Sequence, residues 1–164
     1  MAREIKVVNE GLLVGLVAYA SVAVFYAVFD LLAARGPLYT VNLLGRAVFT
    51  GERDPSVLQF PMSLDLTAIF LYNAMHLILS LVIGLIVVRL VAQAEGHPSQ
   101  ARAVLFTIVA GFVVTILAVG MLTEPMRALL PWWSIVVANV VAVWVAGSYL
   151  LRVHPGIWRT LVTS

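Results

Sequence analysis

Residues 11–34 read GLLVGLVAYASVAVFYAVFDLLAA, an apolar run in which Asp30 is the one charged side chain. The hydrocarbon core of a bilayer is about 30 Å thick, and a helix needs roughly 20 apolar residues to cross it. Glu10 precedes the run, and an Arg-Gly-Pro break follows it at residues 35–37. The stretch therefore predicts a membrane-spanning helix. The sequence Ala-Tyr-Ala at residues 18–20 is typical of a signal-peptide cleavage site, but the apolar run continues well beyond it, so we expect a retained helix.

Three further runs have the same character, at residues 64–92, 100–123 and 132–153, and Ser63 is the expected N-cap of the first of these. Over the whole chain, 62% of residues are hydrophobic and 11% are charged, whereas soluble domains carry about 25% charged residues. A mean hydropathy of +1.04 also excludes a disordered chain, which stays solvated only with low hydrophobicity and high charge. The expected fold is an all-α integral membrane protein, a bundle of four transmembrane helices forming one domain over residues 1–164.

The first connection, residues 35–62, is long for two neighbouring helices, and loops of this length usually contain structure of their own. We expect a short interfacial helix that Thr40 caps, with Asn42 and Arg46 on its polar side. Its apolar side would carry Val41, Leu43, Leu44, Val48 and Phe49. Two interpretations stay open for this helix: it packs on its own bundle, or it docks a partner.

The distribution of Lys and Arg predicts the orientation, because cytoplasmic loops carry an excess of both. One side of the four spans would carry Arg3, Lys6, Arg89, Arg102, Arg152 and Arg159. The other side would carry Arg35, Arg46, Arg53 and Arg127. The larger group predicts that both termini are cytoplasmic, in a multi-pass protein of a bacterial inner membrane.

Small and polar residues form a stripe on each predicted span. Such residues mark helix contacts in lipid, where apolarity does not distinguish the inside of a bundle from its outside. The stripes comprise Gly11, Gly15, Ala18 and Ser21; Asn73, His76, Ser80 and Gly84; Thr107, Gly111, Thr115 and Ala118; and Asn139, Ala142 and Ala146. We expect all four stripes to meet at the bundle axis.

His76 is the one ionisable residue predicted near the bilayer midplane, and such residues are often functional. The candidate site is a cavity that opens to the non-cytoplasmic side. Its lining would be Asp30, Asn73, His76, Asn139 and Glu124, with Tyr26 and Tyr72 nearby. Alternatively, Asp30, Asp65 and Glu124 lie in water at the headgroup level, where Arg35, Arg46 or Arg127 would pair with a carboxylate.

Four roles for His76 stay open: a haem or metal ligand, a proton relay, a hydrogen-bond donor to a quinone, or a plain hydrogen bond to Asn or Ser on another helix. His97 and His154 lie at the cytoplasmic ends, so a second haem ligand would come from another subunit, or from Met75 or Met121. The chain has no cysteine, which excludes thiolate sites. We predict no cofactor and no metal site, with haem or quinone as the alternatives.

No catalytic or nucleotide-binding motif is present. The sequence therefore favours a non-catalytic accessory or structural subunit that packs within a larger membrane complex. One alternative is a small-molecule-binding bundle, for quinone, lipid or haem, around His76. Another is a transporter or channel subunit, although no internal repeat supports it. Expected partners are membrane lipids and other integral membrane subunits or a second copy, and a net charge of +2 in so apolar a chain argues against nucleic acid.

Overall fold

The computed structural model describes residues 2–156, and every regular element within that range is a helix or helical turn. Four long helices are apolar enough to cross a membrane: α1 (Ala2–Leu32), α4 (Leu66–Gly96), α5 (Ala101–Leu122) and α6 (Trp132–Val153). The short elements are α2 (Tyr39–Gly45), a π-helical turn (Arg46–Thr50), α3 (Pro55–Leu58) and 3-10 turns at Pro98–Gln100 and Glu124–Met126. The all-helical, four-span prediction is confirmed at this level, and Arg159, used in the charge argument, lies outside the described residues.

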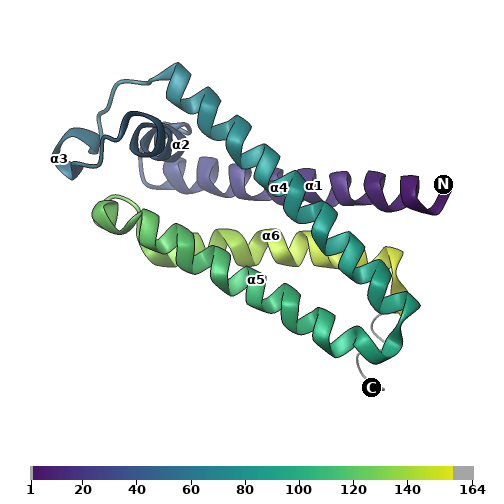
Figure 1. Ribbon diagram of the computed structural model, residues 1–164. Coiled ribbons are helices and arrows are strands. Elements are labelled where there is room, and N and C mark those ends of the chain that lie inside the picture. Colours follow the sequence, from purple (N-terminus) through teal and green to yellow (C-terminus); the bar gives the residue numbers. More distant parts are fainter. Residues whose placement is uncertain (1, 157–164) are drawn as a thin grey trace.

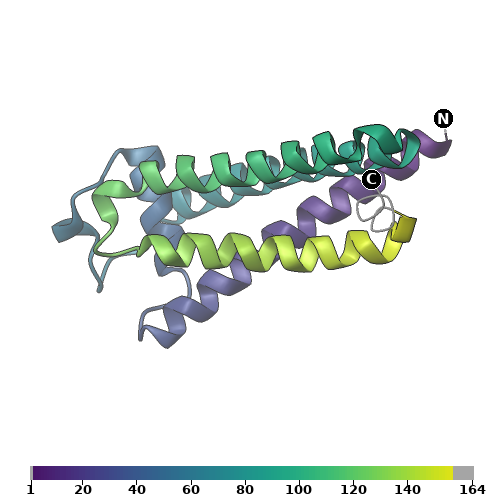
Figure 2. The ribbon, with the colours of Figure 1, turned by 90° about the horizontal axis from the view of Figure 1, so that it is seen from below.

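The long helices alternate in direction, so that α1 begins and α6 ends at the same end of the molecule, beside the connection between α4 and α5 (Figure 1). The short helices α2 and α3 lie at the opposite end, where α1 leads into α4. Seen from below, α1 crosses the other long helices obliquely (Figure 2). This arrangement gives the bundle two distinct ends, called here the terminal end and the α2 end.

Glycines bring α1 and α4 into backbone contact, as the sequence stripes predict. A Cβ atom added to Gly84 would lie 2.7 Å from the Cα atom of Gly15. One added to Gly15 would lie 2.6 Å from the Cα atom of Leu81, and one on Gly11 would lie 2.8 Å from the Cα atom of Leu85. Only residues without a side chain permit this approach, which is how helices gain close packing in lipid.

The stripe on α6 also faces inward. Ala142 and Ala146 are buried, and Ala146 belongs to a small apolar core with Val14 of α1 and Val88 of α4. Three of the four long helices therefore share one core toward the terminal end, and the prediction for their stripes is confirmed.

The prediction for the stripe on α5 is wrong. Thr107, Gly111 and Ala118 are exposed, and a Cβ atom added to Gly111 would meet nothing within 4 Å. Instead, α5 packs through Ala101 and Val104 against the end of α4. The threonine hydroxyls need no neighbouring helix, because Thr107 and Thr115 donate to carbonyl oxygens one turn earlier in α5 itself.

The first connection does not lie on the surface with Asn42 toward water. Asn42 is fully buried; its Nδ2 donates to the carbonyl oxygen of Ser63 at 2.9 Å, and its Oδ1 accepts from the N–H of Asp65 at 2.9 Å. The connection contributes most of the largest apolar core, which contains Tyr39, Leu43, Leu44, Ala47, Leu58, Met126, Leu130 and Ile135. Of the two interpretations, packing on its own bundle describes α2.

Two predicted helix starts also differ from the structure. Leu38, not Thr40, precedes α2, and it makes no side-chain cap. Asp65, not Ser63, is the N-cap of α4, where its carboxylate accepts from the N–H of Ala68 at 2.9 Å. An N-cap is set by the backbone bend as well as by residue type, so several polar candidates in a row leave its position open.

Candidate functional site

His76 lies against two tyrosines in the crossing of α1 and α4. The ring of Tyr19 meets the imidazole edge to face with centroids 5.3 Å apart, and the ring of Tyr72 lies 6.0 Å away. The hydroxyl of Tyr19 donates to Oδ1 of Asn73 at 2.9 Å, and Nδ2 of Asn73 donates to the carbonyl oxygen of Ile69 at 2.9 Å. Tyr19 of α1 thus belongs to a cluster with Tyr72, Asn73 and His76, although the predicted site did not include it.

The sequence carries a signal for Tyr19. Tyr19 lies four residues after Gly15, about one helical turn further along α1, and therefore on the same helix face. Because Gly15 lies against the backbone of Ser80 and Leu81 in α4, the next turn of α1 meets the next turns of α4. Combining the glycine stripe with helical spacing would have placed Tyr19 beside Asn73.

The His76 imidazole forms no hydrogen bond with residues 2–156, and its contacts with them include the two tyrosine rings. The hydrogen bond from His76 to Asn or Ser of a neighbouring helix, one of the four roles left open, is therefore absent within residues 2–156. Within the same range, no group of three His, Asp, Glu or Cys side chains could hold a metal ion. In the described part of this chain, His76 therefore does not belong to a group of residues that could hold a metal ion.

Asp30 performs a structural task at the α2 end. It is fully buried, and its carboxylate accepts from the backbone N–H and from the hydroxyl of Thr40, each at 2.7 Å. Asp30 thus binds the free N–H of the first turn of α2 as an N-cap residue would, although it comes from a different helix. Asp30 therefore does not lie in water at the headgroup level, and it forms no ion pair with an arginine within residues 2–156.

Arg35 instead joins α1 to the loop before α6. Its guanidinium donates to the carbonyl oxygen of Leu129 at 3.1 Å and lies 4.7 Å from the ring centre of Tyr39. Burial raises the pKa of the Tyr39 phenol, which stays neutral and donates to the carbonyl oxygen of Leu58 at 2.9 Å. These contacts tie the connection to the loop before α6 and hold α2 against α3 within the connection.

The remaining predicted site residues are dispersed. Nδ2 of Asn139 donates to the carbonyl oxygen of Ile135 in its own helix at 2.8 Å, Tyr26 packs against the core around Tyr39, and Glu124 is exposed at a 3-10 turn. No hydrogen bond or ion pair in the described range joins Asp30, Asn139 or Glu124 to His76. Of the seven predicted residues, Tyr72, Asn73 and His76 come together, Tyr26 packs with Tyr72 against the core around Tyr39, and their functional role stays a prediction.

A second polar cluster lies at the terminal end, and sequence reasoning missed it. Nε2 of His154 lies 2.6 Å from Oε1 of Glu10, and its Nδ1 lies 2.9 Å from Oε1 of Glu95. Each ring nitrogen of His154 therefore faces a carboxylate oxygen, one from α1 and one from α4. The cluster links α1, α4 and the end of α6. Alternating helix direction brings these three chain positions together, so the topology alone was a signal for it.

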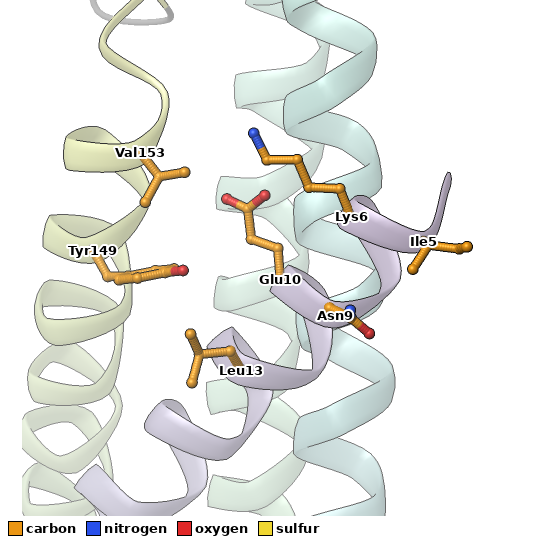
Figure 3. Close-up of a pocket in the computed structure, with 7 residues that line it drawn as sticks. All are labelled: Ile5, Lys6, Asn9, Glu10, Leu13, Tyr149 and Val153. Carbon is orange, nitrogen blue, oxygen red and sulfur yellow. The ribbon is translucent and has the colours of Figure 1, made fainter. Parts of the chain in front are cut away.

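Two open cavities lie between α1 and α6, and the first of them includes Glu10 of this cluster. The first, of about 440 Å³, is lined by Ile5, Lys6, Asn9, Glu10, Leu13, Tyr149 and Val153 (Figure 3). The second, of about 390 Å³, is lined by Val17, Trp144, Val145, Ser148, Tyr149 and Arg152. His76 lines neither of them, so these cavities lie elsewhere than the site predicted from sequence.

Comparison of the chain with known protein families, with curated proteins and with solved structures finds no match. No residue therefore receives a role from a relative. Each role proposed below rests on the contacts and the chemistry of the residue itself.

Proposed function

We propose that the protein is a non-catalytic accessory subunit that packs within a larger membrane complex through α5. The observation that carries this proposal is the uncovered face of small residues on α5, called here the α5 stripe: Thr107, Gly111, Thr115 and Ala118. Thr107, Gly111 and Ala118 are exposed and Thr115 is half-buried. Small residues are enriched where helices touch in lipid because they let two backbones approach.

The chain itself contains the kind of contact that the α5 stripe lacks. Gly11 and Gly15, four residues apart, receive the backbone of α4 at Gly84. Thr107, Gly111 and Thr115 repeat that four-residue spacing, yet a Cβ atom added at Gly111 would meet nothing within 4 Å. A transmembrane helix of another subunit would fill this position. Because the threonine hydroxyls are satisfied within α5, such a contact would rest on close packing.

The first connection is a less suitable docking surface than the α5 stripe. Leu43 and Leu58 are fully buried in the bundle, whereas Phe49, Val57 and Phe60 of the same segment are exposed. Docking through the apolar side of α2, the alternative raised by its sequence, would require Leu43 and Leu44 to leave their core. The α5 stripe is available without such a rearrangement.

Gly111→Leu is expected to release the partner while the bundle itself stays folded. The leucine would separate α5 from the neighbouring helix, and we expect about a tenfold loss of co-purified partner, equivalent to about 1.4 kcal/mol. The measurement is gentle detergent extraction from native membranes, followed by size determination and quantification of each subunit. Wild-type protein should elute in a larger complex that contains this chain in a fixed ratio.

Gly120→Leu is the matched control. Gly120 lies nine residues along α5, two and a half turns away and thus on the opposite face, and a Cβ atom added there also meets nothing within 4 Å. Equal partner recovery from the two variants, or a wild-type protein that elutes alone, would refute the proposal.

A second candidate function is small-molecule binding at His76, favoured by an imidazole that forms no hydrogen bond with residues 2–156. A quinone carbonyl or a haem iron would satisfy a ring nitrogen at that depth. If the protein has this function, His76→Gln should abolish the absorption of a cofactor that co-purifies with the chain. His97→Gln, at the exposed terminal end, should leave that absorption unchanged. Retention of the cofactor signal in His76→Gln would eliminate this candidate.

A further inference from the structure

The two cavities beside α6 follow one helix pair and share Tyr149, so they are treated together as the α1/α6 groove. Its polar part, toward the terminal end, carries Lys6, Asn9, Glu10, Tyr149 and Arg152 together with Ile5 and Val153. Its apolar part, further along both helices, carries Leu13, Val17, Trp144 and Val145, with Ser148 as its one polar lining residue. Figure 3 shows the side chains of Lys6 and Glu10 extending into the same space, opposite Tyr149 of α6. A groove with one polar part and one apolar part matches an amphiphilic molecule.

The length of α1 places the polar part of the groove at the membrane surface. Its 31 residues span about 46 Å at 1.5 Å per residue, more than the roughly 30 Å of the hydrocarbon core. The apolar run begins only at residue 11, so Lys6, Asn9 and Glu10 lie in the part of α1 that extends beyond the core. Tyr149 and Arg152 lie near the end of α6, a depth at which tyrosine and arginine are common.

The charges around the groove leave one positive charge without a counterpart. Lys6 and Arg152 line the groove as cations, and Glu10 is the one anion among its lining residues. Two cations therefore face one anion. One phosphodiester group, with a single negative charge, would balance this set, and basic pockets between helices on the cytoplasmic side are known to bind lipid headgroups.

Glu10 adds a requirement for the headgroup. Its Oε1 is bonded to His154 at 2.6 Å, whereas its Oε2 forms no hydrogen bond within residues 2–156. Figure 3 shows this carboxylate directed into the groove. An ionised carboxylate oxygen accepts from N–H or O–H groups. A ligand that carries such a donor close to its phosphate would satisfy it.

We propose that the α1/α6 groove binds a membrane phospholipid whose headgroup carries a hydrogen-bond donor, ethanolamine or glycerol. The phosphodiester pairs with Lys6 and Arg152, the headgroup donor bonds Oε2 of Glu10, and an acyl chain packs along Leu13 and Trp144. A choline headgroup carries no N–H or O–H, so phosphatidylcholine binds more weakly. The groove and the α5 stripe are on different helices, and this proposal does not depend on the one for α5.

The test is native mass spectrometry of the purified full chain in detergent, titrated with phosphatidylglycerol, phosphatidylethanolamine or phosphatidylcholine. The expected result is one bound lipid, with the first two binding at least about fivefold more tightly than phosphatidylcholine. Replacing both groove cations, Lys6→Gln with Arg152→Gln, should weaken phosphatidylglycerol binding about tenfold. The matched control replaces two exposed cations of the same end outside the groove, Arg89→Gln with Arg102→Gln, and should bind as the wild type does.

Three results would overturn the proposal: an equal loss in the control pair, equal affinity for phosphatidylcholine, or displacement of the lipid by millimolar inorganic phosphate, which has no acyl chain. Ser148→Trp provides a separate check if the cation variants unfold. Ser148 lines the second cavity, so an indole there fills the apolar part of the groove without changing charge. Lipid binding should fall in this variant, and undiminished binding would also contradict the proposal.

Discussion

Gly15→Leu and Gly84→Leu are each expected to force α1 away from α4 and to lower the free energy of unfolding in detergent by about 3 kcal/mol, the upper end of the usual cost of overpacking. The reason is that the added side chains would meet backbone atoms. A Cβ atom at Gly15 would lie 2.6 Å from the Cα atom of Leu81, and one at Gly84 would lie 2.7 Å from the Cα atom of Gly15. A backbone cannot rotate out of the way as a flexible side chain can.

Gly147→Leu is the control for this experiment. It makes the same chemical change within a membrane-spanning helix, but a Cβ atom at Gly147 meets nothing within 4 Å. The free energy of unfolding would be measured for the three variants and the wild type under identical detergent conditions. If Gly15→Leu and Gly147→Leu had equal effects, α1 and α4 would not cross at these glycines.

Asp30→Ala is expected to lower the free energy of unfolding by about 2–4 kcal/mol, because it leaves two buried donors without an acceptor. Both donors belong to Thr40, its backbone N–H and its hydroxyl, each 2.7 Å from the carboxylate. Asp30→Asn should have about half that effect, because its amide oxygen still accepts one of the two bonds. The start of α2 should show the earliest hydrogen exchange in the Ala variant.

The contrasting variant is Asp54→Ala. Asp54 is also a capping carboxylate, which accepts from Ser56 at the start of α3, but it is exposed to water. Water can replace its bonds, so we expect a thermal midpoint close to that of the wild type. An Asp30→Ala variant as stable as Asp54→Ala would show that Asp30 does not cap α2 from within the core.

The number of long apolar helices was predictable because hydropathy is a local property. The run at residues 11–34 needs no knowledge of the rest of the chain to be identified as a span, and the structure places α1 across it. The close crossing of α1 with α4 was also predictable, because Gly11, Gly15 and Gly84 have no side chain and so let the two backbones come into contact. Both inferences concern residues whose effect does not depend on distant neighbours.

The choice of contact face was less predictable. The stripe through Thr107 and Gly111 has the same spacing as the stripe through Gly11 and Gly15, yet only the second meets a helix of its own chain. Residue type shows that a face can receive a helix, but not which helix occupies it. For the same reason, Asn42 looked like a polar surface residue until the chain folded back to Ser63 and Asp65.

In the candidate site, too, contacts within one helix were predictable and contacts between distant residues were not. Tyr72, Asn73 and His76 are neighbours on one helix, so helical spacing alone predicted that they would lie together. The contact between Glu10 and His154 joins residues 144 positions apart, and no local pattern indicates it. Asp30 was identified as unusual, but its partner Thr40 depended on where α2 begins.

The proposed docking of α5 is tested most directly by a cross-link formed in the native membrane. A photoreactive amino acid would be placed at position 111, within the α5 stripe, and in a second preparation at position 120, on the opposite face. Docking through α5 predicts that position 111 yields one protein adduct of constant mass and that position 120 yields none. Adducts with lipid alone from position 111, or the same protein adduct from both positions, would contradict it.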